Sequence, residues 1–124
     1  MTFLKDKKVV VTGGKGFLGR NIVKELKKKD CKEIIALNSK DYDLTKESEV
    51  KRLFSGIKNI DIIIHAAAVV GGIGLNKERP AELFYKNIMM GTMLMEHARI
   101  NKVKKFVALG TVCAYPKFTE VPFK

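Results

Sequence analysis

The sequence predicts an α/β protein built on a doubly wound parallel sheet of about four strands with flanking helices. Short apolar runs rich in β-branched residues alternate along the chain with longer segments whose apolar residues recur at helical spacing. The first apolar run leads directly into a cluster of glycines. Strands that alternate with helices in this way imply a parallel sheet with right-handed crossovers, because each helix returns the chain to the end of the sheet where the previous strand began.

The strands are expected where short apolar runs lie between polar turns. Such runs are typical of strands buried inside a parallel sheet, since both of their faces are covered. Four of them occur, at Lys7–Thr12, Glu33–Leu37, Ile60–Ile64 and Phe106–Leu109.

Three helices are expected between these strands. The first begins after Gly16, where apolar residues recur at helical spacing up to Leu26, and a short second helix spans Glu47–Phe54. The third is long and begins at Pro80, whose missing N–H costs nothing in a first turn. Its apolar residues cover more than one face and therefore predict contacts on two sides: Leu83, Phe84, Ile88, Met90, Leu94, Met95 and Ala98.

The charge of the chain is strongly positive, with 24 Lys and Arg against 13 Asp and Glu, or +11. Such an excess suits an anionic partner but does not identify one. Much of it lies at the ends of two predicted helices, in Lys27–Lys29 and in Lys102, Lys104 and Lys105, where cations complement the helix dipole and stay solvated. No aromatic platform or recognition motif indicates a nucleic-acid partner.

The apolar stretches and the cysteines indicate where in the cell the protein is expected and whether it binds a membrane or a metal. The longest apolar stretch, Ala66–Leu75, is broken by glycines and far shorter than the ~20 residues that span a bilayer, so no membrane partner is expected. The N-terminus lacks the apolar core of a signal peptide. Cys31 and Cys113 are far apart and have no partner at metal-ligand spacing, so we expect no metal site and a cytoplasmic location.

The turn after the first strand, T-G-G-K-G-F-L-G, has the spacing of a phosphate-binding loop. Gly13 permits a tight turn, Gly16 lets the backbone approach a pyrophosphate, and Gly19 allows close packing of helix on strand. The N–H groups at the start of the following helix then favour an anion. The sequence therefore predicts a dinucleotide site, with a merely structural turn as the alternative. The residues expected to contact the cofactor here are Gly13, Gly14, Lys15, Gly16, Phe17, Leu18 and Gly19.

The end of the second strand indicates which dinucleotide is bound. A site for NAD usually has an acidic residue there, which bonds the ribose 2′-hydroxyl. This chain has Asn38, Ser39 and Lys40, and no carboxylate before Asp41. Because Lys40 and Lys15 can both reach a 2′-phosphate, NADP is the predicted cofactor, bound also by Asn38. The alternative is that both lysines are ordinary surface residues.

These motifs resemble a known superfamily. The spacing G-x-x-G-x-x-G resembles the short-chain dehydrogenases/reductases, which have a Rossmann-type fold, and T-G-G-x-G-F-L-G resembles their extended branch, which acts on nucleotide sugars. The stretch H-A-A-A from His65 is similar to the H-x-A-A motif of that branch, as is N-I-M-M-G-T with Asn87 and Gly91. The segments V-G-G-I-G and L-G-T-V-C-A-Y-P-K resemble the GDP-L-fucose synthase family.

The resemblance implies an activity and further site residues. Members of that family epimerise GDP-4-keto-6-deoxy-D-mannose and reduce it to GDP-L-fucose with hydride from NADPH. Thr111 stands at the hydroxyl position that polarises the carbonyl, and Cys113 at that of an acid/base in epimerisation. Asp43 is expected near the adenine, unless it is only a carboxylate at a helix N-terminus. The further cofactor contacts expected are Ala66, Ala67, Asn87 and Leu109.

The resemblance also implies partners and leaves alternatives open. The expected partner is a GDP-linked 4-keto-6-deoxyhexose. A homodimer of the full-length protein is also expected, formed through the helix from Pro80, unless that helix only packs on its own sheet. One alternative is another NAD(P)-dependent nucleotide-sugar epimerase or dehydratase. The other is a non-catalytic nucleotide-binding module.

One family motif is missing where it is expected. The reducing site of the superfamily needs Tyr-x-x-x-Lys on a helix after the strand that carries Thr111. The string occurs only at Tyr42–Lys46, in a predicted turn, and we interpret it as a chance match. Residues 1–124 are therefore expected to be the N-terminal part of an NAD(P)-binding Rossmann domain, without the catalytic Tyr-x-x-x-Lys segment or a C-terminal substrate domain.

Overall fold

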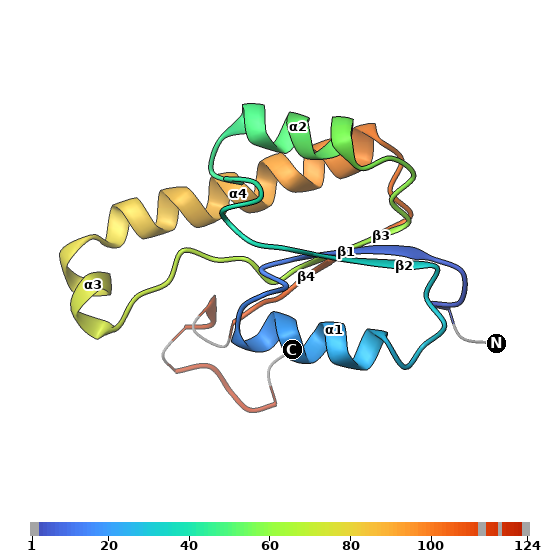
Figure 1. Ribbon diagram of the computed structural model, residues 1–124. Helices are drawn as coiled ribbons and strands as arrows, with labels where there is room; N and C mark the ends of the chain where they lie inside the picture. Colours follow the sequence, from blue (N-terminus) through green and yellow to red (C-terminus); the bar gives the residue numbers. More distant parts are fainter. Residues whose placement is uncertain (1–2, 112–113, 117, 123–124) are drawn as a thin grey trace.

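Four parallel strands form the centre of the fold in the computed structural model, which describes residues 3–111, 114–116 and 118–122 (Figure 1). The strands are β1 (Lys8–Thr12), β2 (Glu33–Leu37), β3 (Ile62–His65) and β4 (Lys105–Ala108), in the spatial order β2-β1-β3-β4. In the register of the sheet, the Cα of Val10 lies opposite those of Ile35 and Ile63. This confirms the predicted fold class.

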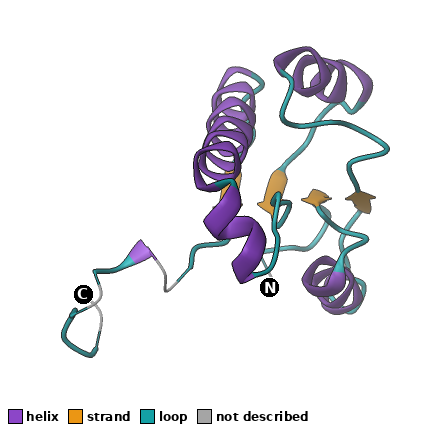
Figure 2. Cartoon of the chain, turned by 90° about the vertical axis from the view of Figure 1, so that its left-hand side faces the viewer, coloured by secondary structure: helices purple, strands orange, loops and turns teal. Residues whose placement is uncertain are grey.

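Helices cover both faces of the sheet (Figures 1 and 2). Helix α1 (Phe17–Leu26) lies on one face, and α2 (Glu47–Gly56) and α4 (Pro80–Ile100) lie side by side on the other. The short helix α3 (Ile73–Glu78) precedes α4 and was not predicted. It has six residues, none of them buried, and therefore no apolar periodicity that the sequence could reveal.

Two apolar cores result from the alternation of side chains along the strands. Val10 and Ile63 point to the face of α2 and α4, whereas Val9, Val11 and Ile62 pack with α1. The larger core also contains Leu53 of α2 and Leu94 of α4, which are completely buried. Burial of a leucine side chain contributes about 1.5–3 kcal/mol, so these two residues hold the helix pair on the sheet.

Helix α4 has two apolar faces, as the sequence predicts. Its buried face, which packs on the sheet and on α2, consists of Leu83, Met90, Leu94 and Ala98. The other carries Phe84, Ile88 and Met95, which are 69%, 49% and 51% exposed. No described helix is both long and apolar enough to cross a membrane.

Lysines gather at the amino-terminal edge of the sheet, opposite the glycine turn. Lys27–Lys29 directly follow the end of α1, and Lys102 and Lys104 lie between α4 and β4. Asp61 organises this edge, because its carboxylate accepts hydrogen bonds from the Lys8 N–H (3.0 Å) and from the Lys104 ammonium (2.7 Å). These contacts lower the pKa of Asp61, chiefly through Lys104. Strand β3 begins directly after Asp61, at Ile62, which is two residues later than the predicted start at Ile60.

Candidate dinucleotide-binding site

The glycine turn follows β1 and is held by close backbone contacts. Gly13 has a φ of +67°, and a Cβ there would lie 2.8 Å from Ala66 O and Ala67 N. A Cβ at Gly19 would overlap the Gly13 carbonyl oxygen and lie 2.7 Å from Gly14 Cα. Only glycine fits at these two positions, because a side chain would either strain the backbone or separate α1 from the turn.

The amino end of α1 is open to a ligand. Gly16 is the N-cap, and no described side chain caps this end of the helix. The first N–H to bond within the helix is that of Arg20, which donates to Gly16 O at 3.0 Å. The N–H groups of the first turn before it, on Phe17, Leu18 and Gly19, have no acceptor within the helix. Such a terminus attracts anions, because its unpaired N–H groups and the helix dipole both favour negative charge.

A cavity of about 400 Å³ lies over this helix end and the carboxyl ends of β1, β2 and β3. Ligands in open α/β sheets bind at this edge, and the volume is that of a small-molecule site. The lining includes nine of the predicted residues, namely Gly13, Gly16, Phe17, Leu18, Gly19, Asn38, Asp43, Ala66 and Ala67. Leu18 is 52% exposed and lines this cavity.

Five predicted residues lie outside the lining that the described residues form: Gly14, Lys15, Lys40, Asn87 and Leu109. Gly14 is buried against β2, where a Cβ would lie 2.8 Å from Ala36 Cα, and its N–H donates to Leu37 O at 2.8 Å. The Leu109 N–H donates to His65 O at 3.3 Å and thereby prolongs the pairing of β4 with β3. Both contacts hold the backbone together at the edge of the site.

Asn87 on α4 holds the segment that follows β3. Its Oδ1 accepts the Val69 N–H at 2.8 Å, and its Nδ2 donates to Val69 O at 2.8 Å and to Leu83 O at 2.9 Å. All of these contacts are to the chain itself, so Asn87 shapes the wall of the cavity through Val69, which is one of the lining residues. This role of Asn87 has no local signal in the sequence, from which a direct contact with the cofactor was predicted.

A buried polar pair fixes the other end of the same segment. The Thr12 hydroxyl is completely buried, lies 2.7 Å from His65 Nδ1 and accepts the Ala67 N–H at 3.3 Å. A hydroxyl has one donor and two acceptor positions, so it serves Ala67 and His65 together, and the tautomer of the ring decides which partner donates at Nδ1. Burial lowers the pKa of His65 and so favours the neutral imidazole. The histidine of the H-x-A-A motif is thereby connected, through Thr12, to the loop that follows β3.

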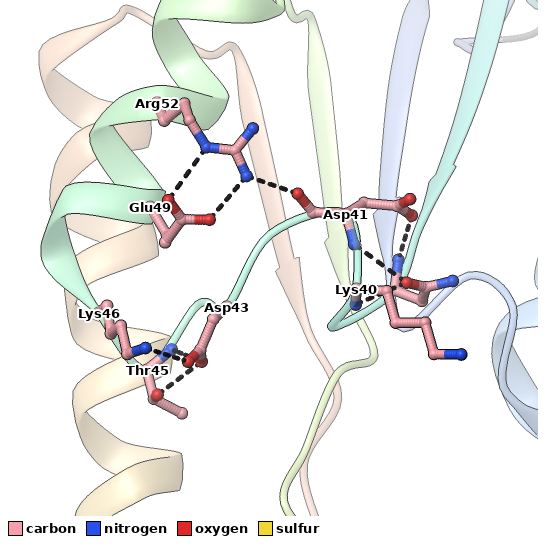
Figure 3. Close-up of polar contacts among 8 residues, drawn as sticks. Lys40, Asp41, Asp43, Thr45, Lys46, Glu49 and Arg52 are labelled. Carbon is pink, nitrogen blue, oxygen red and sulfur yellow. Dashed lines mark hydrogen bonds and ion pairs between the residues drawn. The ribbon is translucent and has the colours of Figure 1, made fainter.

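The turn between β2 and α2, whose polar contacts are drawn in Figure 3, borders the cavity with Asn38, Tyr42 and Asp43, at the end where the sequence predicts the adenosine. Asp43 Oδ1 accepts hydrogen bonds from the Thr45 hydroxyl at 2.6 Å and from the Thr45 N–H at 3.2 Å. Lys46 Nζ lies 3.3 Å from the other carboxylate oxygen, Asp43 Oδ2. The hydrogen bond from Thr45 is the main cause of the lowered pKa of Asp43. Asp43 therefore both lines the cavity and organises the turn that leads into α2.

Tyr42, which sequence analysis did not assign to the site, also lines the cavity. The Arg52 guanidinium lies 4.2 Å from the centre of its ring. Tyr42 and Lys46 precede α2 and share no helix face, as expected if this Tyr-x-x-x-Lys string is a chance match. An aromatic ring four residues after Asn38 was the signal that could have indicated a wall for an adenine.

The two residues predicted to be catalytic lie beyond β4. Thr111 is exposed and lines a second pocket with Gly110, Ala114 and Tyr115, separate from the cavity over the glycine turn. Cys113 lies outside the described residues. In the part of the chain that the structure describes, no cluster of three or more His, Cys, Asp or Glu side chains could hold a metal ion.

The fold and the cavity together define a dinucleotide-binding α/β domain. The profile of the NAD dependent epimerase/dehydratase family matches residues 9–124. The chain belongs to this family.

Curated relatives extend well beyond the matched region. The chain is 36% identical over 124 residues to the GDP-L-fucose synthase of Sinorhizobium fredii, a match that covers 100% of this chain and 39% of the relative. It is 37% identical over 110 residues to the GDP-L-colitose synthase of Yersinia pseudotuberculosis, which covers 89% of this chain and 35% of the relative. The chain thus spans little more than a third of the length of these relatives.

A solved structure has the same fold. The GDP-L-fucose synthetase from Naegleria fowleri, in a crystal structure bound to NADP, superimposes with a TM-score of 0.85 at 29% identity. The match covers 100% of this chain and 40% of that one.

Proposed function

We propose that this chain is the cofactor-binding part of an NADP-dependent epimerase/reductase that acts on a GDP-linked 4-keto-6-deoxyhexose and forms GDP-L-fucose. The observation that carries the proposal is the cavity of about 400 Å³ over the open amino end of α1, with Gly13 and Gly19 as its close-packed base. The relatives named as GDP-L-fucose synthases support the substrate, and the relative bound to NADP supports the cofactor.

The residues of the cavity fit a dinucleotide. Free N–H groups at the start of α1 suit the pyrophosphate, and Tyr42 and Asp43 lie where the adenosine is expected. The alanines after β3, Ala66 and Ala67, leave room for the nicotinamide half. Bound NADPH supplies hydride to a ketone, and the chain's own part is to bind and orient it. Thr111 is proposed to donate a hydrogen bond to that ketone, and Cys113 to move the proton in epimerisation.

The exposed face of α4, formed by Phe84, Ile88 and Met95, supports a homodimer. Apolar side chains gathered on one helix face are typical of a subunit contact. Sedimentation of the chain at several concentrations tests this part of the proposal. A monomer at every concentration would contradict it.

Two other functions are distinguished by the nucleotide that binds. Purification with tightly retained NAD would favour a nucleotide-sugar epimerase or dehydratase of another kind. Binding of nucleotides without preference for a dinucleotide would favour a non-catalytic module. The relatives named as colitose and fucose synthases favour the reductase.

Titration of the purified chain with NADPH, followed by the fluorescence of the reduced nicotinamide, tests the proposal. We expect saturable binding at one site, and competition by NADP. AMP, which lacks the pyrophosphate and the nicotinamide, should compete far more weakly. Absence of binding by any dinucleotide to folded protein would overturn the proposed function.

A further inference from the structure

The turn after β2 folds back and brings a carboxylate to the end of this strand. In the sequence, no acidic residue directly follows the strand. Asn38 Oδ1 accepts the N–H groups of Lys40 (2.7 Å) and Asp41 (3.1 Å), which folds the chain back on itself. Asp41 Oδ2 then accepts the Asn38 N–H at 2.9 Å. The carboxylate of Asp41 therefore lies at the end of β2, although three residues separate it from Leu37 in the chain.

The same carboxylate is paired with the glycine turn. Lys15 Nζ lies 3.0 Å from Asp41 Oδ2, and this ion pair joins the two loops that flank the adenosine end of the cavity. The side chains are 53% and 33% exposed, so both charges are accessible from solvent at the rim of the cavity. The pKa of Asp41 is lowered, first by the Asn38 N–H and then by Lys15, and the residue is ionised at neutral pH.

Neighbouring contacts keep the backbone of this turn in place. Arg52 Nη2 donates to Asp41 O at 2.6 Å, and Arg52 is itself held by Glu49 through two hydrogen bonds (Figure 3). The side chain of Lys40 extends away from the Asp41 carboxylate in the same view. Lys15 is therefore the cation that lies beside this carboxylate.

A carboxylate and an ammonium at this place favour different cofactors. An acidic group at the end of the second strand accepts a hydrogen bond from the ribose 2′-hydroxyl of NAD and repels a 2′-phosphate. A lysine ammonium attracts the 2′-phosphate of NADP, with three donors that can serve two acceptors at once. When the two charges lie in contact, each offsets the preference that the other would impose.

We infer that the Lys15–Asp41 pair determines dinucleotide specificity, and that it lets the site accept both NADP and NAD, with only a modest preference for NADP. The inference rests on the proposed function, because it requires that a dinucleotide binds in this cavity. Asp41 serves the 2′-hydroxyl of NAD, and Lys15 serves the 2′-phosphate of NADP. Each half of the pair is thus a specificity-determining residue with an effect of opposite sign.

Dissociation constants of NADPH and NADH, measured for the wild type and for Asp41→Asn and Lys15→Met, test the inference. Asp41→Asn should bind NADPH more tightly and NADH more weakly, which raises the preference for NADPH roughly three- to tenfold. Lys15→Met should lower the same preference by about tenfold or more, since it leaves Asp41 unpaired beside the 2′-phosphate. Lys15→Arg should keep the binding of NADPH, because it keeps the cation.

The pair Lys28–Glu25, 2.7 Å apart on α1, supplies matched controls. Glu25→Gln and Lys28→Met change the net charge by the same amounts as the test variants and should leave the preference unchanged. If the wild type binds neither dinucleotide, the proposed function itself fails. If it binds dinucleotides but Asp41→Asn and Lys15→Met leave the ratio of the two constants within twofold of the wild type, the specificity inference alone is wrong. Circular dichroism of each variant confirms that the fold is kept.

Discussion

Substitution of Gly19 by alanine probes the contact on which the site is built. The added Cβ would meet three backbone atoms of the glycine turn, among them Gly13 C and Gly14 Cα, both at 2.7 Å. Carbon atoms in contact are normally about 3.5–4.0 Å apart, so the overlap approaches 1 Å. None of these atoms belongs to a flexible side chain that could move aside. Helix α1 must therefore shift away from the turn.

Gly19→Ala should lower the free energy of unfolding by about 3 kcal/mol, the upper end of the range for overpacked cores. Small proteins have a free energy of unfolding of about 5–15 kcal/mol, so Gly19→Ala should be among the most destabilising single substitutions in the chain. For a protein of this size, the loss corresponds to a fall in Tm of roughly 10 °C. Urea denaturation followed by circular dichroism measures the free energy, and differential scanning calorimetry measures the Tm.

Two other glycines provide the comparison. A Cβ at Gly74 of α3 would have no atom within 4 Å, so Gly74→Ala should not destabilise the protein. A Cβ at Gly16 would lie 3.2 Å from Gly13 O on an ordinary extended backbone, so Gly16→Ala should change stability by less than about 1 kcal/mol and still weaken binding of NADPH. The reasoning about the turn is refuted if Gly19→Ala unfolds at the same urea concentration as Gly74→Ala.

Further predictions concern the polar contacts around the cavity. Thr12→Val should cost about 1–3 kcal/mol in urea denaturation because it leaves buried groups unpaired, whereas Thr12→Ser should restore most of the stability; equal stability of the two variants would contradict the pairing with His65. The pKa of His65 is lowered by burial, so its contribution to stability is complete above the unfolded pKa of 6.5 and is lost as the pH falls towards the lower folded pKa. Titration by NMR should give a value below 6.5, and a value at or above it would be evidence against a neutral buried ring. Asn87→Ala should increase amide hydrogen exchange at Val69 by about tenfold or more, since that N–H loses its acceptor; unchanged exchange would show that the side chain does not hold the loop.

Much of the fold was predictable because it depends on local patterns. The runs of β-branched residues marked all four strands, with errors of at most two residues at their ends. The glycine spacing located the turn and the open helix end, since only glycine satisfies the backbone at Gly13 and Gly19. Helix α3 was missed because it buries none of its side chains and therefore leaves no periodicity in the sequence.

The roles of polar side chains were less predictable. Asn87 contacts the backbone of Val69 across 18 positions in the sequence, and such a pairing has no local signature. Asp41 was too far from β2 to count as its terminal carboxylate, yet the turn that begins at Asn38 returns it there. In both cases the tertiary structure decides which groups meet. The sequence reveals only that these groups are present.

The crowding of lysines at the amino-terminal edge has a consequence for how quickly an anionic cofactor is captured. A strand of five residues is about 16 Å long, which is roughly twice the Debye length of about 8 Å at physiological ionic strength. Dissolved ions therefore screen the charges of Lys27–Lys29 and Lys104 at the distance of the cavity, despite the net charge of +11. Long-range steering of a dinucleotide falls instead to the amino end of α1, because Asp41 offsets the charge of Lys15. The association rate should therefore depend on salt far less than the overall charge suggests.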